Sequence, residues 1–371
     1  MNEKTELEEI TSNGFHLEES GNGDIDLAVL SLRIALKAYF STYQCFNGLL
    51  YQIIDEDDKD WPDELRYYNQ KENLKYREAY AECIVHFHHF AELVCKNFLH
   101  NENPLLIRKF KNDKSKNINE KYTREKYINR EDISEYIIHN KETVNFSEAV
   151  DRLVEFINAK SLKDYQQLLF LVDNQYMLKK LAVLRNQVWH RGLYILPYKD
   201  LDKFIGKYVL QFVVSVTQYL DNLHNLYMIH NTLNCGIDPI TEIINHFTKD
   251  SYKIEKIAFL KELGRAAYNV PLYWYWQDKN KNAKEKETIE KTAIVISEDN
   301  DDSEICKCPV CGFNSLIIHK YVEYELDEYG EYESESSYPI RVKCECCSFE
   351  LHNDISNASE YGIEGIRDYW V

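Results

Sequence analysis

The stretch Cys308-Pro309-Val310-Cys311-Gly312, together with Cys344-Glu345-Cys346-Cys347, decides the fold of the C-terminal part of the chain. Each stretch places two cysteines three positions apart, so two thiolates can hold one ion when the chain turns between them. Gly312 allows the backbone to come close to the sulfur. Two such pairs are typical of a metal site. The sequence therefore predicts one zinc ion bound by Cys308, Cys311, Cys344 and Cys347.

Four cysteines fill every position of this expected site, which favours a structural zinc, because a catalytic zinc keeps one position open. A redox-active dithiol is the alternative for a single pair, but it does not explain the second pair. Cys306 and Cys346 are spare. Either of them could take the place of one of the four ligands. The alternative is that each is only a thiol near the site.

The segment between Cys311 and Cys344 alternates apolar and polar residues and predicts strands at Leu316–Ile318, Tyr321–Tyr324 and Tyr338–Val342. An acidic loop lies between them, so residues 305–371 are expected to form a small β zinc ribbon with an enlarged hairpin tip. The negative charge of the tip argues against phosphate contact there. The ribbon's task stays open between binding a nucleic acid, binding a partner and capping the fold.

Upstream of the ribbon, residues 278–304 change from lysine-rich to acidic and are expected to be a charged linker, with the apolar patch Ala293–Ile296 unexplained. A protease should cut there first. Loss of a zinc ligand, as in Cys311→Ser, should then unfold the ribbon and largely spare the helical body. Residues 1–23 are polar and are expected to be a flexible N-terminus.

Residues 24–277 show the apolar spacing of amphipathic helices and predict a helical domain. Asn145, with Glu148 three residues later, is a strong helix start. The region 101–143 is polar and is expected to be an insertion with short helices. Longer helices are expected at about 24–54, 71–99, 145–157, 162–190, 198–227 and 240–267.

The composition limits the class of protein. A chain of 371 residues with 44% hydrophobic residues can form one large or two smaller domains. The net charge of -18 excludes a general attraction to nucleic acid or membranes, so any such contact needs a local patch. There is no signal-peptide pattern and no apolar run long enough to span a bilayer. Six of the ten cysteines lie between Cys306 and Cys347 in a metal-site pattern, which indicates a reducing, cytoplasmic location.

One helix ends in Arg185-Asn186, three further residues and His190. Imidazole is a general acid or base near neutral pH, guanidinium can clamp a phosphate, and an amide can orient a hydroxyl. Together these groups suit attack of a ribose 2′-hydroxyl on the adjacent phosphate. Asn186 and His190 share a helix face, whereas Arg185 lies about 140° around a regular helix from His190. The alternative interpretation is packing, because Val188 and Trp189 are packing residues and the helix dipole favours a C-terminal histidine.

This Arg-Asn-x-x-x-His-Arg-Gly helix, followed by a loop and another long helix, resembles the HEPN (higher eukaryote and prokaryote nucleotide-binding) family over roughly residues 24–228. The resemblance implies a mainly α, HEPN-like helical bundle with insertions. It also implies a metal-independent endoribonuclease, with two protomers lining one cleft and with Arg185 stabilising the phosphate, His190 acting as acid and base, and Asn186 positioning them. Many such proteins are toxins or antiviral effectors, so an antitoxin or regulatory partner is possible. The insertion and the ribbon have no counterpart in minimal family domains.

Lys179, Lys180 and Arg191 flank the motif and are the expected RNA-binding residues. Two other functions stay open: a non-catalytic RNA- or nucleotide-binding module, and an adaptor that docks through the acidic hairpin. Three further groups are interpreted as structural, namely the histidines His86, His88 and His89, the cysteines Cys45, Cys83 and Cys95, and the aromatic cluster Tyr273–Trp276.

Overall fold

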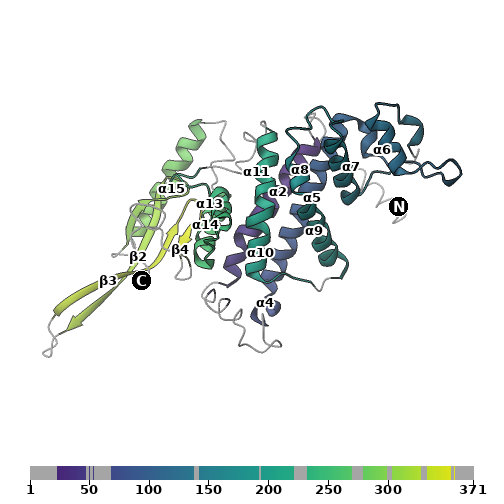
Figure 1. Cartoon of the computed structure of the whole chain (residues 1–371). Helices are drawn as coiled ribbons and strands as arrows, with labels where there is room; N and C mark the ends of the chain where they lie inside the picture. Colours follow the sequence, from purple (N-terminus) through teal and green to yellow (C-terminus); the bar gives the residue numbers. More distant parts are fainter. Residues whose placement is uncertain are drawn as a thin grey trace, which may run out of the picture. The chain divides into compact units, whose positions relative to one another are not determined.

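The computed structural model describes residues 23–46, 50, 53, 68–137, 142–191, 194–220, 232–269, 279–298, 303–326, 332–351 and 355 (Figure 1). The described chain is mainly helical, with one small antiparallel sheet near its C-terminus, which confirms the expected fold class. No helix in these ranges is long and apolar enough to cross a membrane. Tyr273–Trp276 and the expected N-terminus 1–22 lie outside the described residues.

The chain forms two compact units. The first comprises Met1–Leu32 and His86–Ala182, and the second comprises Arg33–Val85 and Val183–Val371. Two long helices, α2 (Gly23–Ser41) and α5 (Leu74–Glu102), contribute residues to both. The division expected from the sequence, with a helical domain at 24–277 and a ribbon at 305–371, stays a prediction.

The first unit contains a buried arginine that bonds to several of its segments. Arg152 of α7 (Phe146–Asn158) is fully buried; it donates to the carbonyls of Leu106 and Arg108 at 2.5 and 2.7 Å and to the Glu148 carboxylate at 2.6 Å. Its guanidinium lies 3.8 Å from the centroid of the Phe110 ring. These bonds anchor the polar insertion, which contains the expected short helices: η3 (Pro104–Ile107), η4 (Lys114–Lys116), α6 (Glu120–Ile128) and η5 (Ser134–Tyr136).

Several expected helices differ at their boundaries. Asn145 caps α7 as expected, because its side chain accepts the Glu148 N–H at 2.9 Å. The helix expected at 162–190 begins with turns and contains α8 (Phe170–Asp173), α9 (Gln175–Asn186) and a π-helical segment, η6 (Gln187–Arg191). The helix expected at 240–267 is two helices, α13 (Pro239–Thr248) and α14 (Ile254–Ala267), because the chain turns at Asp250 with a φ of 51°.

Helix α14 is largely buried in the helical part of the second unit. Besides α13 and α15 (Lys279–Glu298), this part contains η2 (Thr42–Phe46), α4 (Tyr68–Glu72), α10 (Tyr198–Phe204), η7 (Ile205–Val209) and α11 (Leu210–Tyr219). Lys261 of α14 and Asp202 of α10 form a fully buried ion pair. The ammonium also donates to the hydroxyls of Thr42 at 2.8 Å and Tyr198 at 3.2 Å, so it connects three elements. The attraction within a buried pair is largely offset by desolvation, whereas removal of either partner would leave an uncompensated buried charge.

The sheet has the strand order β1-β2-β3-β4, with all neighbours antiparallel. Its strands are β1 (Glu304–Lys307), β2 (Asn314–Leu326), β3 (Tyr332–Cys344) and β4 (Glu350–Leu351). The three expected strand segments are confirmed. The register between β2 and β3 runs from Leu316↔Cys344 to Leu326↔Tyr332, so part of the expected acidic loop is strand. The two strands extend as a long arm (Figure 1).

The region expected to be a linker contains a helix, α15 (Lys279–Glu298). Ala293, inside the apolar patch that the sequence left unexplained, is fully buried, and the Glu290 carboxylate accepts the Asn314 N–H of β2 at 3.0 Å. Lys286 lies 5.1 Å from the centroid of the Phe313 ring. The charged residues therefore form the exposed side of a helix that packs against the ribbon, a pattern that composition alone does not distinguish from a linker.

Candidate metal centre and candidate nuclease motif

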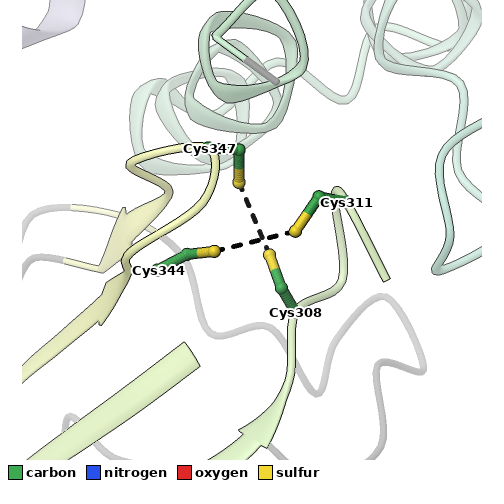
Figure 2. Close-up of side chains that lie close together, drawn as sticks. All are labelled: Cys308, Cys311, Cys344 and Cys347. Carbon is green, nitrogen blue, oxygen red and sulfur yellow. Dashed lines mark hydrogen bonds between the residues drawn. The ribbon is translucent and has the colours of Figure 1, made fainter. Parts of the chain in front are cut away.

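Four cysteine side chains converge on one point in the ribbon (Figure 2). The sulfurs of Cys308 and Cys347 are 3.6 Å apart, and those of Cys311 and Cys344 are 3.7 Å apart. All four sulfurs lie within 4.8 Å of one another, so the cluster can hold a single metal ion. In the described ranges this is the one such cluster of three or more potential ligands.

The two cysteine turns have the same backbone geometry. In the first, the Cys308 N–H donates to the Phe313 carbonyl at 2.8 Å and the Gly312 N–H donates to the Cys308 carbonyl at 3.0 Å. In the second, the equivalent bonds of 2.7 and 3.0 Å join Cys344 to the Phe349 carbonyl and to the Ser348 N–H. The residue four positions after the first cysteine is left-handed in both turns, with φ of 78° at Gly312 and 57° at Ser348. Two matched turns therefore present two pairs of thiols to one another.

Burial of the four thiols favours a bound cation. Burial raises the pKa of Cys308 well above the ordinary value of a thiol, because an isolated thiolate is costly away from water. Cys308, Cys344 and Cys347 are all fully buried. A bound metal ion would compensate the negative charge and hold the thiolates deprotonated.

The first turn is bonded to the segment before α13. The Cys235 N–H donates to the Pro309 carbonyl at 2.8 Å. A Cβ on Gly312 would lie 2.7 Å from Oδ1 of Asn234. Gly312 is therefore required by its left-handed backbone and by contact with Asn234, rather than by the expected approach to sulfur.

The second turn is bonded to α14 through one arginine. Arg265 donates to the carbonyl of Ser348, and its Nη1 donates to the Ser348 hydroxyl at 3.2 Å. The guanidinium is held by Glu262 through bonds of 2.6 and 2.7 Å. Phe259 meets Phe349 edge-on, with ring centroids 6.5 Å apart. The first cysteine turn is thus attached to the segment before α13 and the second to helix α14 of the same unit.

Glu262 joins the helices to the ribbon. Its side chain is fully buried and also accepts the Glu350 N–H of β4 at 2.6 Å and the Tyr43 hydroxyl of η2. Burial and this carboxylate raise the pKa of Tyr43 well above its ordinary value, so the phenol stays protonated and can donate. Sequence reasoning missed Asn234, Glu262 and Arg265, because polar residues in helices and loops are normally solvated and nothing in their spacing indicated otherwise.

The spare cysteines do not belong to the four converging side chains, although the Cys346 thiol contacts Cys311. Burial raises the pKa of Cys306 to about 11, so this thiol stays protonated at neutral pH. The Cys346 N–H donates to the Cys344 sulfur at 3.4 Å, which gives that residue a backbone role beside the site. Of the remaining cysteines singled out, Cys83 and Cys95 are fully buried and Cys45 is half-buried.

The Arg-Asn-x-x-x-His motif lies at the end of α9 and in η6. Arg185 is half-buried and Asn186 is exposed; the Arg185 Nη1 donates to the Asn186 Oδ1 at 3.1 Å. His190 belongs to the π-helical segment, and its side chain is outside the described residues, as is that of Arg191. The hydrogen bonds of a π-helix join residues five positions apart, so each residue rotates the chain less than in an α-helix. The angle around the helix axis between positions 185 and 190 is therefore smaller than the 140° of a regular helix.

The structure gives the two expected RNA-binding lysines local partners. Lys179 forms an ion pair with Asp151 at 2.6 Å, which reduces the free positive charge that it can offer. Lys180 lies 5.1 Å from the centroid of the exposed Tyr176 ring. The role of these lysines in RNA binding stays a prediction.

The histidines near residue 88 do not converge. His89 shares a hydrogen bond of 2.8 Å with the Ser31 hydroxyl, and His88 contacts the Phe146 ring edge-on at 4.7 Å between centroids. These neighbours support the structural interpretation.

The site thus comprises a four-thiol metal centre and a separate basic motif at a helix end. No family model matches the chain, and no curated protein or solved structure is significantly similar to it.

Proposed function

We propose that Cys308, Cys311, Cys344 and Cys347 bind one structural Zn²⁺. A tetrahedral zinc with Zn–S bonds of about 2.3 Å separates its sulfurs by about 3.8 Å. The two measured separations of 3.6 and 3.7 Å agree with this spacing. A cluster of several iron atoms would fit less well, because its thiolates bind different irons and stand further apart. Elemental analysis of the full-length chain should give one zinc per chain; a Cys344→Ser variant should bind much less.

We further propose that the helical part is a metal-independent endoribonuclease. The observation that carries this proposal is the hydrogen-bonded pair of Arg185 and Asn186 at an accessible helix end, five and four residues before His190. The guanidinium can stabilise charge that develops on a phosphate, and the amide can orient it. A toxin or antiviral effector would use such an activity.

The chemistry balances without a metal. His190 takes the proton of a ribose 2′-hydroxyl, the 2′-oxygen bonds to the adjacent phosphorus, and the bond from phosphorus to the 5′-oxygen breaks. A second imidazole or the protonated His190 returns a proton to the leaving oxygen. The products are a 2′,3′-cyclic phosphate and a 5′-hydroxyl. Two copies of the chain, paired about a two-fold axis, would supply both imidazoles and both guanidinium groups to one cleft.

The test is cleavage of a mixed RNA by the full-length chain in EDTA, with zinc content measured in the same samples. Arg185→Ala and His190→Ala should each lower the rate at least a hundredfold, in line with loss of an acid–base or charge-stabilising group. His100→Ala, which removes an exposed histidine of α5, is the matched control and should leave the rate unchanged. Equal cleavage by the His190→Ala variant would refute the nuclease. Binding without cleavage would instead favour the non-catalytic RNA-binding module.

The adaptor function has its own supporting observation. Tyr321 and Tyr324 of the β2–β3 arm are 51% and 59% exposed, beside acidic residues such as Glu323. An exposed aromatic and acidic arm suits a basic protein partner. Loss of a captured partner after Tyr321→Ser and Tyr324→Ser, with zinc retained, would support this function.

A further inference from the structure

Trp189 is an exposed aromatic residue within the Arg-Asn-x-x-x-His motif. It lies in η6, and 64% of its surface is exposed. A single exposed apolar residue is common on protein surfaces, so this exposure has significance only together with the polar groups around it.

The indole and the Arg185 guanidinium form one surface. The guanidinium carbon lies 5.7 Å from the centroid of the Trp189 ring, within the range of a cation–π contact. The same guanidinium donates to Asn186, which orients it and uses one of its five N–H groups. The guanidinium therefore lies over one face of the indole, and a ligand base would stack on the rest of the exposed ring, next to this phosphate-binding group.

This combination matches the chemistry of a single-stranded nucleotide. Bases stack on exposed aromatic rings in a sequence-tolerant way, while guanidinium groups bind the neighbouring phosphate. In a duplex the faces of the bases are covered by their neighbours, so a stacking ring selects single strands, loops and bulges. The chain's net charge of -18 makes such a local contact necessary for RNA binding.

We propose that Trp189 is a stacking platform for one nucleobase of single-stranded RNA, next to the phosphate that Arg185 binds. The inference deepens the proposed ribonuclease and rests on it for the identity of the ligand. It makes Trp189 a residue that selects single strands with little preference among bases.

Tyr208 provides a matched control. The residue is 44% exposed, and the Lys207 ammonium lies 5.7 Å from the ring centroid, the same distance as in the Arg185–Trp189 pair. Tyr208 lies in η7, away in sequence from the Arg-Asn motif. Any general effect of removing an exposed aromatic beside a cation should therefore appear equally in a Tyr208→Ala variant.

The experiment measures binding of the full-length chain to a fluorescent 2′-O-methyl oligonucleotide, which lacks the attacking hydroxyl and stays intact. Trp189→Ala should weaken binding about tenfold, which corresponds to the stacking of one base. Trp189→Phe should retain most of the affinity, and Tyr208→Ala should retain all of it. The same sequence in duplex form should bind more weakly and should not respond to Trp189→Ala.

Sedimentation of each variant separates RNA stacking from contact between two copies. A Trp189→Ala variant that binds as tightly as the wild type overturns the inference. So does one that loses affinity only together with dimerisation, since Trp189 would then pack against a second copy. Cleavage of unmodified RNA is measured separately: cleavage that is unaffected by Trp189→Ala overturns this inference alone, and stacking without any cleavage overturns the nuclease alone.

Discussion

Replacing Glu262 by glutamine should destabilise the helices and the metal centre together. The carboxylate accepts four hydrogen bonds: Oε1 from Arg265 and the Glu350 N–H, and Oε2 from Arg265 and the Tyr43 hydroxyl. A glutamine amide replaces one of the two oxygens by an NH₂ group. An NH₂ group at the Oε1 position faces two donors, Arg265 and the Glu350 N–H. At the Oε2 position it faces the Arg265 Nε–H, whereas the Tyr43 hydroxyl can rotate and accept from it. In either orientation at least one bond to Arg265 is lost and the charge that the guanidinium faces is removed.

The structure sets the size of this effect. Hydrogen bonds to a charged group contribute about 1.5–3 kcal/mol each, and breaking one partner of a buried ion pair costs about 3–5 kcal/mol. Since Glu262 is fully buried, we expect the free energy of unfolding to fall by about 3–5 kcal/mol. Glu287→Gln is the matched control, because Glu287 pairs with Lys291 at 2.6 Å on the exposed side of α15. Glu287→Gln should not change the free energy of unfolding measurably.

Urea unfolding of the zinc-loaded, full-length chain checks this prediction with two probes: helical circular dichroism and release of zinc to an indicator dye. In the wild type both should report the same transition, since α14 holds one metal-binding turn through Arg265. Glu262→Gln should move both transitions to lower urea. A loss no larger than that of Glu287→Gln, or zinc release that precedes helix unfolding unchanged, would refute the coupling.

Three further predictions follow from the same contacts. Removing the metal with a chelator should increase hydrogen exchange in α14 as well as in the ribbon, because α14 contacts the second cysteine turn. The sequence-based expectation was that the helical body is spared, and unchanged exchange in α14 would contradict the present prediction. Limited proteolysis should spare α15 in the wild type and cut it in the Ala293→Glu variant, because Ala293 is fully buried. Early cutting of α15 in the wild type would instead support the interpretation of this region as a linker. Burial lowers the pKa of His89 below 6.5, so the unfolded chain binds the proton more readily and stability should fall as the pH drops below about 6.5; His89→Gln should flatten this dependence in urea unfolding.

The convergence of the four cysteines was predictable from the sequence because its signal is local. Two cysteines three positions apart can bind one ion in only a few backbone conformations, so the spacing indicates the geometry. The strands beside Cys311 and Cys344 were predictable for the same reason, since alternation of apolar residues is read over a few positions. The cap of α7 at Asn145 is another short-range pattern.

What the sequence did not predict depends on distant partners. Glu262 and Lys261 are consecutive charged residues that a helical pattern places on the surface, and each is buried only because Tyr43 or Asp202 arrives from elsewhere in the chain. The charged helix α15 resembled a linker because its buried face is narrow. The π-helical segment at Gln187–Arg191 likewise has no composition signal, although it changes the geometry of the motif.

The left-handed backbone at Ser348 couples the conformation of the second cysteine turn to the position of α14. A non-glycine residue in this conformation carries a strain of about 1–3 kcal/mol, and at Ser348 the bonds from Arg265 and Asn269 offset it. Gly312 has the same conformation without that strain. Linkage is reciprocal: if a metal ion binds the cluster, a change that displaces α14 should weaken metal affinity at the second turn, and metal binding should favour the docked helix by the same free energy. Metal affinity measured at equilibrium would therefore report on the docking of α14.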